Sequence, residues 1–184
     1  MQDQISNIPL FSPPFRISYG EIYIYEFSSG EEDMKKVCVG GTFDRLHRGH
    51  KVLIEKAFEI AGKEGKVIIG LSAGALAEKK KNCLDFNERK KNLENFLKAR
   101  GFSNYEIHPI YDKYGLTLVE DFDVIVVSEE TFDVAVEINR MRKERGLAEM
   151  EIVKIPMIKA EDGRPISSSR IKKGEIDEEG RLTG

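Results

Sequence analysis

The sequence of 184 residues contains no tryptophan, only two cysteines and only three histidines. Two cysteines cannot make a disulfide framework. Cys38 lies in an apolar run and Cys83 in a polar stretch, and neither has a partner at the spacing of metal ligands. The expectation is two reduced thiols in a cytoplasmic protein.

Long apolar runs and a large charge of one sign are also missing. No apolar run approaches the length that crosses a membrane, and residues 1–4 lack the basic start of a secretion signal. The formal net charge is −3, whereas a general nucleic-acid binder is normally strongly basic. The composition therefore predicts neither a membrane nor a nucleic-acid partner, and the length suits one main domain.

The first 33 residues differ from the rest of the chain. Pro9, Pro13 and Pro14 interrupt any helix there, and residues 21–27 have the composition of a strand. We expect residues 1–33 to be an extension that adds an edge strand or pairs with a neighbouring subunit. The oligomeric state stays open.

From residue 36 onward, strand-like and helix-like segments alternate. Runs rich in valine and isoleucine predict strands over 36–40, 66–72, 105–110, 123–128 and 151–155. Apolar periodicity predicts helices over 50–63, 85–100 and 131–146, and a further helix from near Ser168. Asp85 and Glu88 are expected to form a capping box, and Gly101 and Gly146 to end two helices. The alternation predicts an α/β fold, a Rossmann-like doubly wound parallel sheet of about five strands.

Such sheets bind ligands at the carboxyl ends of their strands, near the point where the strand order reverses. Ser72 and Ser128 follow predicted strand ends, as does the glycine pair Gly40-Gly41, so we expect all three at one edge. The loop reads Gly-Gly-Thr-Phe-Asp and not Gly-x-Gly-x-x-Gly, which gives an oxidoreductase little support.

The segment 40–50 predicts a phosphate site. It places His47 and His50 between the glycine pair and the start of a predicted helix. Glycines let the backbone approach an anion closely, and the free N–H groups of a helix start point toward it. Imidazoles, as donors or cations, stabilise negative charge that grows during a reaction. The alternative is an ordinary turn with two surface histidines.

Gly41-Thr42-Phe43-Asp44 followed by His47-x-Gly49-His50 resembles the signature of the nucleotidyltransferase α/β phosphodiesterase superfamily. A second element, Ile166-Ser167-Ser168-Ser169-Arg170, follows roughly 120 residues later. Members of this superfamily move a nucleoside monophosphate from a nucleoside triphosphate to another phosphate. The resemblance implies that residues 34–184 are a nucleotidyltransferase domain.

Within the superfamily, segments 126–131 and 137–142 resemble the archaeal and eukaryotic type of phosphopantetheine adenylyltransferase. That resemblance implies transfer of the adenylyl group of ATP to 4′-phosphopantetheine by direct displacement, with dephospho-coenzyme A and pyrophosphate as products. It also implies Mg²⁺ held mainly by the substrate phosphates and water, with no metal site on the protein itself.

The resemblance also implies roles for individual residues. His47 and His50 would act at the reacting phosphates, and Lys80 would contact the attacking phosphate, although Lys79 and Lys81 leave the register open. The expected ATP- and substrate-binding residues are Gly41, Thr42, Phe43, Asp44, Gly49, Ser72, Ser128, Arg140, Ser167, Ser168, Ser169 and Arg170.

Several of these residues have a structural alternative. Phe43 is expected to shape the loop by packing more than to stack on a base, and Asp44 either orients the loop or is an ordinary turn residue. One serine of the run 167–169 is a natural helix cap. Bacterial members carry an arginine-rich turn where this chain has Ser-Glu-Glu-Thr, and Arg140 or Arg142 is the candidate for the missing charge.

Two other functions stay open at this stage. One is another transferase of the superfamily, such as a glycerol-phosphate cytidylyltransferase or an FAD synthetase, because the two motifs do not distinguish them. The other is a non-catalytic nucleotide sensor that keeps the fold. A pyrophosphate-release assay with different nucleotides and acceptors separates all three.

Overall fold

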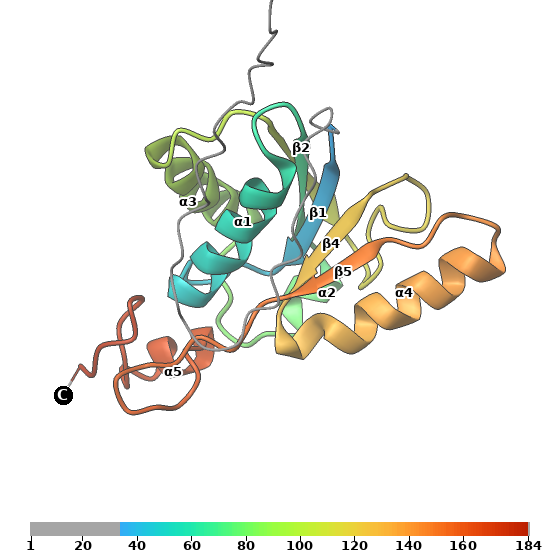
Figure 1. Ribbon diagram of the computed structural model, residues 1–184. Coiled ribbons are helices and arrows are strands. Elements are labelled where there is room, and N and C mark those ends of the chain that lie inside the picture. The colour runs from blue at the N-terminus through green and yellow to red at the C-terminus, as the bar shows by residue number, and fades with distance from the viewer. Residues whose placement is uncertain (1–33, 184) are drawn as a thin grey trace, which may run out of the picture. The chain divides into compact units, whose positions relative to one another are not determined.

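The computed structural model describes residues 34–183, so the strand predicted at 21–27 and the expected extension lie outside the described residues. The strands are β1 (Lys36–Gly41), β2 (Lys66–Ser72), β3 (Tyr105–Ile110), β4 (Val124–Val127) and β5 (Glu151–Lys154). All pair in parallel, in the order β3-β2-β1-β4-β5 (Figure 1). The predicted α/β fold with a five-stranded parallel sheet is confirmed.

The helices are α1 (Arg48–Ala61), α2 (Ala75–Glu78), α3 (Phe86–Ala99), α4 (Phe132–Glu144) and α5 (Ser168–Lys172), with a 3-10 turn η1 (Glu129–Thr131) before α4. The predicted bounds agree to within about two residues, the usual uncertainty of helix ends. Helix α2 was not predicted, because four residues are too few to show a helical period. No helix within residues 34–183 is long and apolar enough to cross a membrane.

The caps of α3 show one success and one error of the sequence interpretation. The Asp85 side chain accepts hydrogen bonds from the amides of Asn87 (2.8 Å) and Glu88 (3.0 Å), as expected of an N-cap. Within the described chain, the Glu88 side chain does not accept a hydrogen bond from the Asp85 amide, so the prediction of a capping box is wrong. Gly101, with φ +73°, follows the helix as predicted.

The sheet is buried on both faces because the strands alternate between two apolar layers. Val37 and Val39 pack with helices α1 and α3 in one cluster, whereas Cys38 packs with α4 in the other. This is the two-residue period of a strand with helices on both sides. It explains why the strand sequences are continuously apolar.

Strand β1 pairs with β2 on one edge and with β4 on the other. The chain therefore extends the sheet in one direction through β2 and β3, and in the other through β4 and β5. The strand order reverses beside β1, and ligands of doubly wound sheets bind at this point. The loop after β1 lies there.

Helix α4 corrects one expectation about the basic residues. Arg142 is fully buried, and its guanidinium donates to the carbonyl oxygens of Ala148, Thr117 and Glu120 at 2.6, 2.5 and 2.8 Å. It therefore joins the end of α4 to the loop before β4 and supplies no charge to a ligand site.

Asn139 has a similar structural role on the same helix. Its amide group donates to the carbonyl oxygen of Met150 (2.7 Å) and accepts from the Met150 amide (2.9 Å). Ile138 is buried beside it in the core. Within the segment 137–142 that carried part of the sequence resemblance, Asn139 thus holds the chain just before β5.

Candidate functional site

The loop after β1 is held in a strained conformation by its own phenylalanine. Phe43 and Arg45 have φ values of +48° and +49°, a region that costs a residue with a Cβ about 1–2 kcal/mol. The Phe43 ring is buried and lies over Gly41, where a Cβ would come within 3.1 Å of it. A side chain at Gly41 would therefore crowd the Phe43 ring, which packs over the loop.

His47 and His50 stand together at the start of α1. Their rings are stacked with centroids 3.7 Å apart, and the Phe43 ring meets His50 edge to face at 5.4 Å. Neither Nδ1 atom has a hydrogen-bond partner within the described residues. A Cβ on Gly49 would lie 3.2 Å from the His47 ring, so a larger residue between the two histidines would press on that ring.

Both imidazoles are uncharged at neutral pH. Burial, followed by the charges of Lys80 and Lys51, lowers the pKa of His47 to about 4. Burial, the neighbouring His47 and Lys80 lower the pKa of His50 well below its ordinary value. Of the two options that the sequence left open, the structure favours neutral hydrogen-bond donors over cations.

A cleft of about 540 Å³ brings the two sequence motifs together. We call it the polar cleft. Its lining includes His47, Gly49 and His50 from the first motif and Ser167–Ser169 from the second. Lys79–Lys81, Ser128 and Lys172 line it as well, with the apolar segment Pro156–Ile158 after β5. Segments about 120 residues apart in sequence thus face one space.

A second hollow of about 370 Å³, the apolar cavity, opens on the α4 side of the sheet. Gly40, Gly41 and Gly70 line it where β1 and β2 run side by side. Tyr114, Leu116, Val134 and Ile138 line it from the loop after β3 and from α4. Sequence reasoning missed this cavity, because the segment that contributes Tyr114 and Leu116 to its wall carries no recognisable motif.

The apolar cavity also has polar residues in its lining. Thr42, Ser72, Lys79 and Lys80 line it, and both lysines also line the polar cleft. The Ser72 hydroxyl is buried and has no hydrogen-bond partner in the described part of the chain. Lys79 and Lys80 therefore line both hollows, whereas Lys81 lines the polar cleft and not the apolar cavity.

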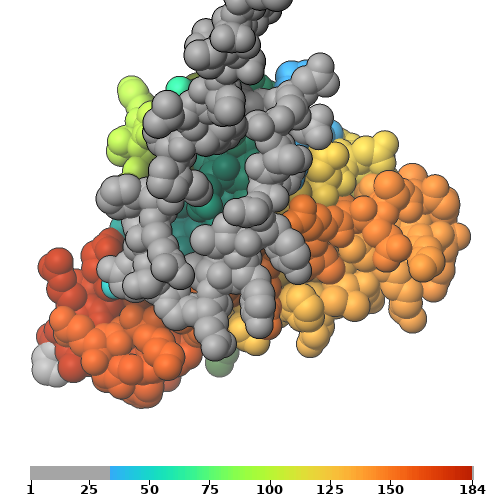
Figure 2. Space-filling model, in the orientation of Figure 1, coloured from blue at the N-terminus to red at the C-terminus, as the bar shows by residue number. Residues whose placement is uncertain are grey.

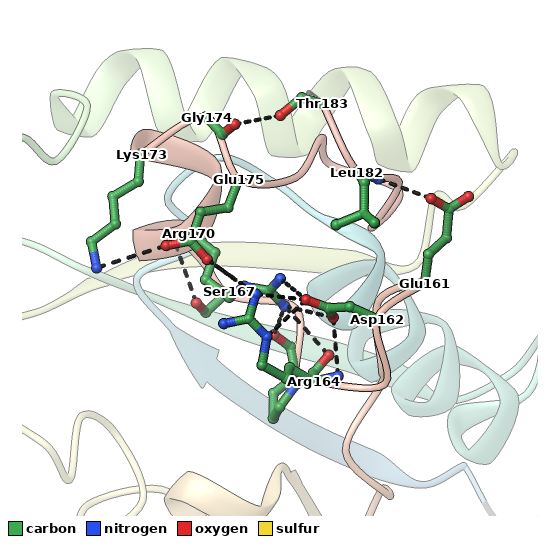
Figure 3. Close-up of polar contacts among 11 residues, drawn as sticks. Glu161, Asp162, Arg164, Ser167, Arg170, Lys173, Gly174, Glu175, Leu182 and Thr183 are labelled. Carbon is green, nitrogen blue, oxygen red and sulfur yellow. Dashed lines mark hydrogen bonds and ion pairs between the residues drawn. The ribbon is translucent and has the colours of Figure 1, made fainter.

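Four expected ligand residues line neither hollow, namely Phe43, Asp44, Arg140 and Arg170. Arg140 is exposed on α4. The Arg170 guanidinium is bound by the carboxylates of Asp162 (2.5 Å) and Glu175 (2.9 Å), as Figure 3 shows. It also donates to the Pro165 carbonyl oxygen (3.0 Å). Arg170 thus braces the turn before the serine run, so a nucleotide contact by its side chain is not supported.

Sequence reasoning missed Arg89, a buried residue of α3. Its guanidinium donates to the carbonyl oxygens of Leu84, Thr42 and Ser72 at 2.9, 2.8 and 2.9 Å. One side chain thereby fixes the loop after β1, the end of β2 and the start of α3. A basic residue in an amphipathic helix gives no signal of this, because its usual place is the solvated face.

Comparisons with known proteins show the family of the chain. Residues 38–174 match the model of the cytidylyltransferase-like family. The phosphopantetheine adenylyltransferase of Methanosarcina barkeri is 50% identical over 151 residues, which cover 81% of this chain and 93% of that protein. The chain belongs to the phosphopantetheine adenylyltransferase family.

Solved structures support the same fold for this family member. A protein of unknown function from Archaeoglobus fulgidus superposes with a TM-score of 0.61 and 38% identity, over 65% of this chain and 88% of that one. A pantoate-beta-alanine ligase from Francisella tularensis gives a TM-score of 0.52 at 16% identity, over 79% and 67% of the two chains. The second likeness shows the fold alone.

The buried histidine pair predicts a loss of stability between pH 6.5 and 4. The pKa of His47 is about 4 in the folded chain and 6.5 in the unfolded chain. The unfolded state therefore takes up protons first as the pH falls, and folding loses up to about 3 kcal/mol across this window. Urea unfolding at pH 7, 5.5 and 4.5 measures the effect.

The control is the double variant His47→Asn/His50→Asn, which removes both titrating rings. Its free energy of unfolding should fall less between pH 7 and 4.5 than that of the natural chain. The ion pair with Lys66 lowers the pKa of Glu106 to about 2, so that carboxylate affects stability mainly at lower pH. Equal slopes for the two proteins would contradict the burial argument.

Proposed function

We propose that this chain transfers the adenylyl group of ATP to 4′-phosphopantetheine, which gives dephospho-coenzyme A and pyrophosphate. The observation that carries the proposal is the pair of adjoining hollows, one polar and one apolar, that share Lys79 and Lys80. Such a transferase must hold donor and acceptor side by side, with attacking and leaving oxygens in line. The name of the 50% identical relative supports this reaction.

The polar cleft suits ATP. Lys79–Lys81 provide cations along it, and Ser167 and Ser169 provide hydroxyl groups from the opposite segment. Clustered cations both attract a triphosphate and stabilise the charge that moves during its cleavage. We place the phosphates between the imidazoles and the serine run, and the adenine ring against Pro156–Ile158.

The imidazoles act as hydrogen-bond donors in this scheme. A neutral imidazole has one N–H group to donate and one nitrogen to accept. Donors that are fixed in advance in a buried site stabilise developing negative charge without reorganisation. His47 and His50 would donate to the α-phosphate and to the oxygen that leaves with pyrophosphate, while the lysines supply the net charge.

The apolar cavity suits the acceptor. The pantetheine arm of the acceptor is long and uncharged, with two amide groups along it, and the phosphate is the charged end. The cavity lining is mainly apolar and also includes Thr42, Ser72 and the two shared lysines. We place the acceptor phosphate beside these polar residues, where the buried Ser72 hydroxyl has no partner within the described residues.

The proposed step is a direct displacement. An oxygen of the acceptor phosphate attacks the α-phosphorus of ATP, and the bond to the bridging oxygen breaks so that pyrophosphate leaves. Cys38 lines the apolar cavity, but burial raises its pKa to about 12, so it stays a protonated thiol. A thiol in that state is a poor nucleophile, which favours a path without a covalent enzyme intermediate.

Magnesium would enter with the nucleotide. Within residues 34–183, no group of three or more His, Cys, Asp or Glu side chains could hold a metal ion. The Asp44 carboxylate is paired with Lys172, and Glu130 is the acidic residue that lines the polar cleft. This donor set fits a Mg²⁺ ion whose ligands are mainly the substrate phosphates and water.

Pyrophosphate release tests the proposed reaction. We expect release from ATP with 4′-phosphopantetheine, because the apolar cavity accepts its uncharged arm. Much less is expected from CTP with glycerol phosphate, or from ATP with FMN. Binding of ATP without turnover on any acceptor would support the nucleotide sensor, and preference for another pair would support a different transferase.

His50→Ala should lower turnover roughly 100- to 1000-fold, because one preorganised donor is worth about 2.7–4 kcal/mol in the transition state. ATP binding, measured by titration calorimetry, should change little. The matched control is His108→Ala on β3, since His108 pairs with Glu106 and lines neither hollow. Normal turnover of the His50 variant would remove this residue from the mechanism.

Lys80→Ala should chiefly harm use of the acceptor. The loss of one charge-assisted contact to its phosphate predicts an increase in acceptor KM of roughly 10- to 100-fold. Lys81→Ala is the comparison, because Lys81 lines only the polar cleft of the two hollows and should affect ATP more. A larger acceptor effect in Lys79→Ala would move the assignment by one residue.

A further inference from the structure

The C-terminal segment, residues 156–183, packs around an apolar cluster of its own. Ala160, Ile166 and Ile176 are its buried members, and this cluster is separate from the two that cover the sheet. The ion pairs of Arg170 brace the segment internally (Figure 3). In the space-filling view, its orange-to-red atoms gather at one end of the domain, away from α4 (Figure 2). The segment therefore has the properties of a small unit that carries the serine run.

Polar contacts join this unit to the rest of the domain at two places. The first is at the surface, where Lys51 of α1 forms an ion pair with Glu179 and the Arg48 amide donates to the Glu178 carbonyl oxygen (2.8 Å). The second lies at the polar cleft, where Lys172 of α5 forms an ion pair with Asp44. Both places involve the first motif, since Arg48 lies between His47 and Gly49, but only the second joins that motif to the helix that carries the serine run within the described residues.

Asp44 connects three segments of the chain. Its carboxylate accepts from the Leu84 amide (3.1 Å) and pairs with Lys172, and its carbonyl oxygen accepts from the Ser168 hydroxyl (2.5 Å). The residue is fully buried and lines neither hollow. It therefore acts on a ligand through the groups that it holds.

Lys172 completes the connection from the other side. Its ammonium group also donates to the carbonyl oxygen of Lys81 (2.9 Å), and its side chain is 15% exposed. The loop after β1, the segment Lys79–Lys81 and the helix that carries the serine run thus meet at the ion pair between Asp44 and Lys172. The attraction between two charges is stronger where water is excluded. Removing one partner of a buried pair leaves the other charge uncompensated, so the pair restricts where the two side chains can lie.

We propose that Asp44 and Lys172 are positioning residues for the nucleotide. Their ion pair holds the serine run at the distance from the imidazole pair that one bound triphosphate spans. This inference rests on the proposed binding of ATP in the polar cleft. It differs from the ligand role that the sequence resemblance implied for Asp44, since here the carboxylate contacts Lys172 and the loop instead of the substrate.

The decisive experiment compares Asp44→Asn, Lys172→Met and the double variant in the full-length chain. The measured quantities are the Kd of a non-hydrolysable ATP analogue, the kcat, and the KM of each substrate. We expect each single variant to weaken analogue binding roughly tenfold with little change in acceptor KM. Because both residues act through one contact, the double variant should be no weaker than the worse single variant.

Three further measurements separate this role from a general loss of stability. Lys172→Arg keeps the charge and should retain most analogue affinity. Glu179→Gln breaks the exposed ion pair with Lys51 and should leave Kd within about twofold, since exposed pairs contribute little. Hydrogen exchange of residues 167–172, measured without nucleotide, should speed up in Asp44→Asn more than exchange of β1 does.

Each outcome bears on a different claim. Additive losses in the double variant, or a much larger loss for Lys172→Met, would show that Lys172 contacts the nucleotide directly and would overturn the proposal. Unchanged affinity in both single variants would overturn it as well. If the natural chain binds no ATP analogue, the proposed function fails, and hydrogen exchange alone then decides whether Asp44 fixes the serine run.

Discussion

Strand β1 is hydrogen-bonded on both edges, to β2 and to β4, and the placement of the site depends on that central pairing. Parallel strands end at the same edge of the sheet, so Gly41, Ser72 and Ser128 emerge close together. After β1 the chain adds β2 and β3 on one side of it and then β4 and β5 on the other. The strand order therefore reverses beside β1, which is where doubly wound sheets bind ligands. Both hollows include residues of this edge, namely Gly41 and Ser72 in the apolar cavity and Ser128 in the polar cleft.

Buried polar side chains hold the loops around the site in place through hydrogen bonds to their backbone. Loops have backbone groups without regular partners, and these groups must be satisfied where water is excluded. Arg89 satisfies carbonyl oxygens of three segments around the site, and Arg142 does the same for the loop before β4. The cost of burying a guanidinium is offset by these bonds. Catalysis by positioning needs loops that are held in this manner.

The site separates charge from hydrogen-bond donation. Lysines at the rim of the polar cleft carry the positive charge, whereas the buried imidazoles stay neutral because burial and Lys80 oppose their protonation. In the proposed reaction, the neutral imidazoles donate hydrogen bonds and the lysines supply the positive charge. Because the imidazoles are neutral, the nearby lysines do not repel them. This division follows from the depth at which each side chain lies.

The sequence by itself determined the strands, the longer helices and the two motifs, because these depend on local periodicity, on glycine and on capping residues such as Asp85. It also pointed to the edge of the sheet at which the motifs meet. Only the tertiary structure decided which basic residues face a ligand. In the sequence, Arg89, Arg142 and Arg170 are basic residues just as Lys80 is. In the structure, carbonyl oxygens and carboxylates bind the three arginines, whereas Lys80 lines both hollows. The protonation of the histidines, the apolar cavity and the pairing of Asp44 with Lys172 were likewise decided by burial and by contacts between distant segments, which no local pattern records.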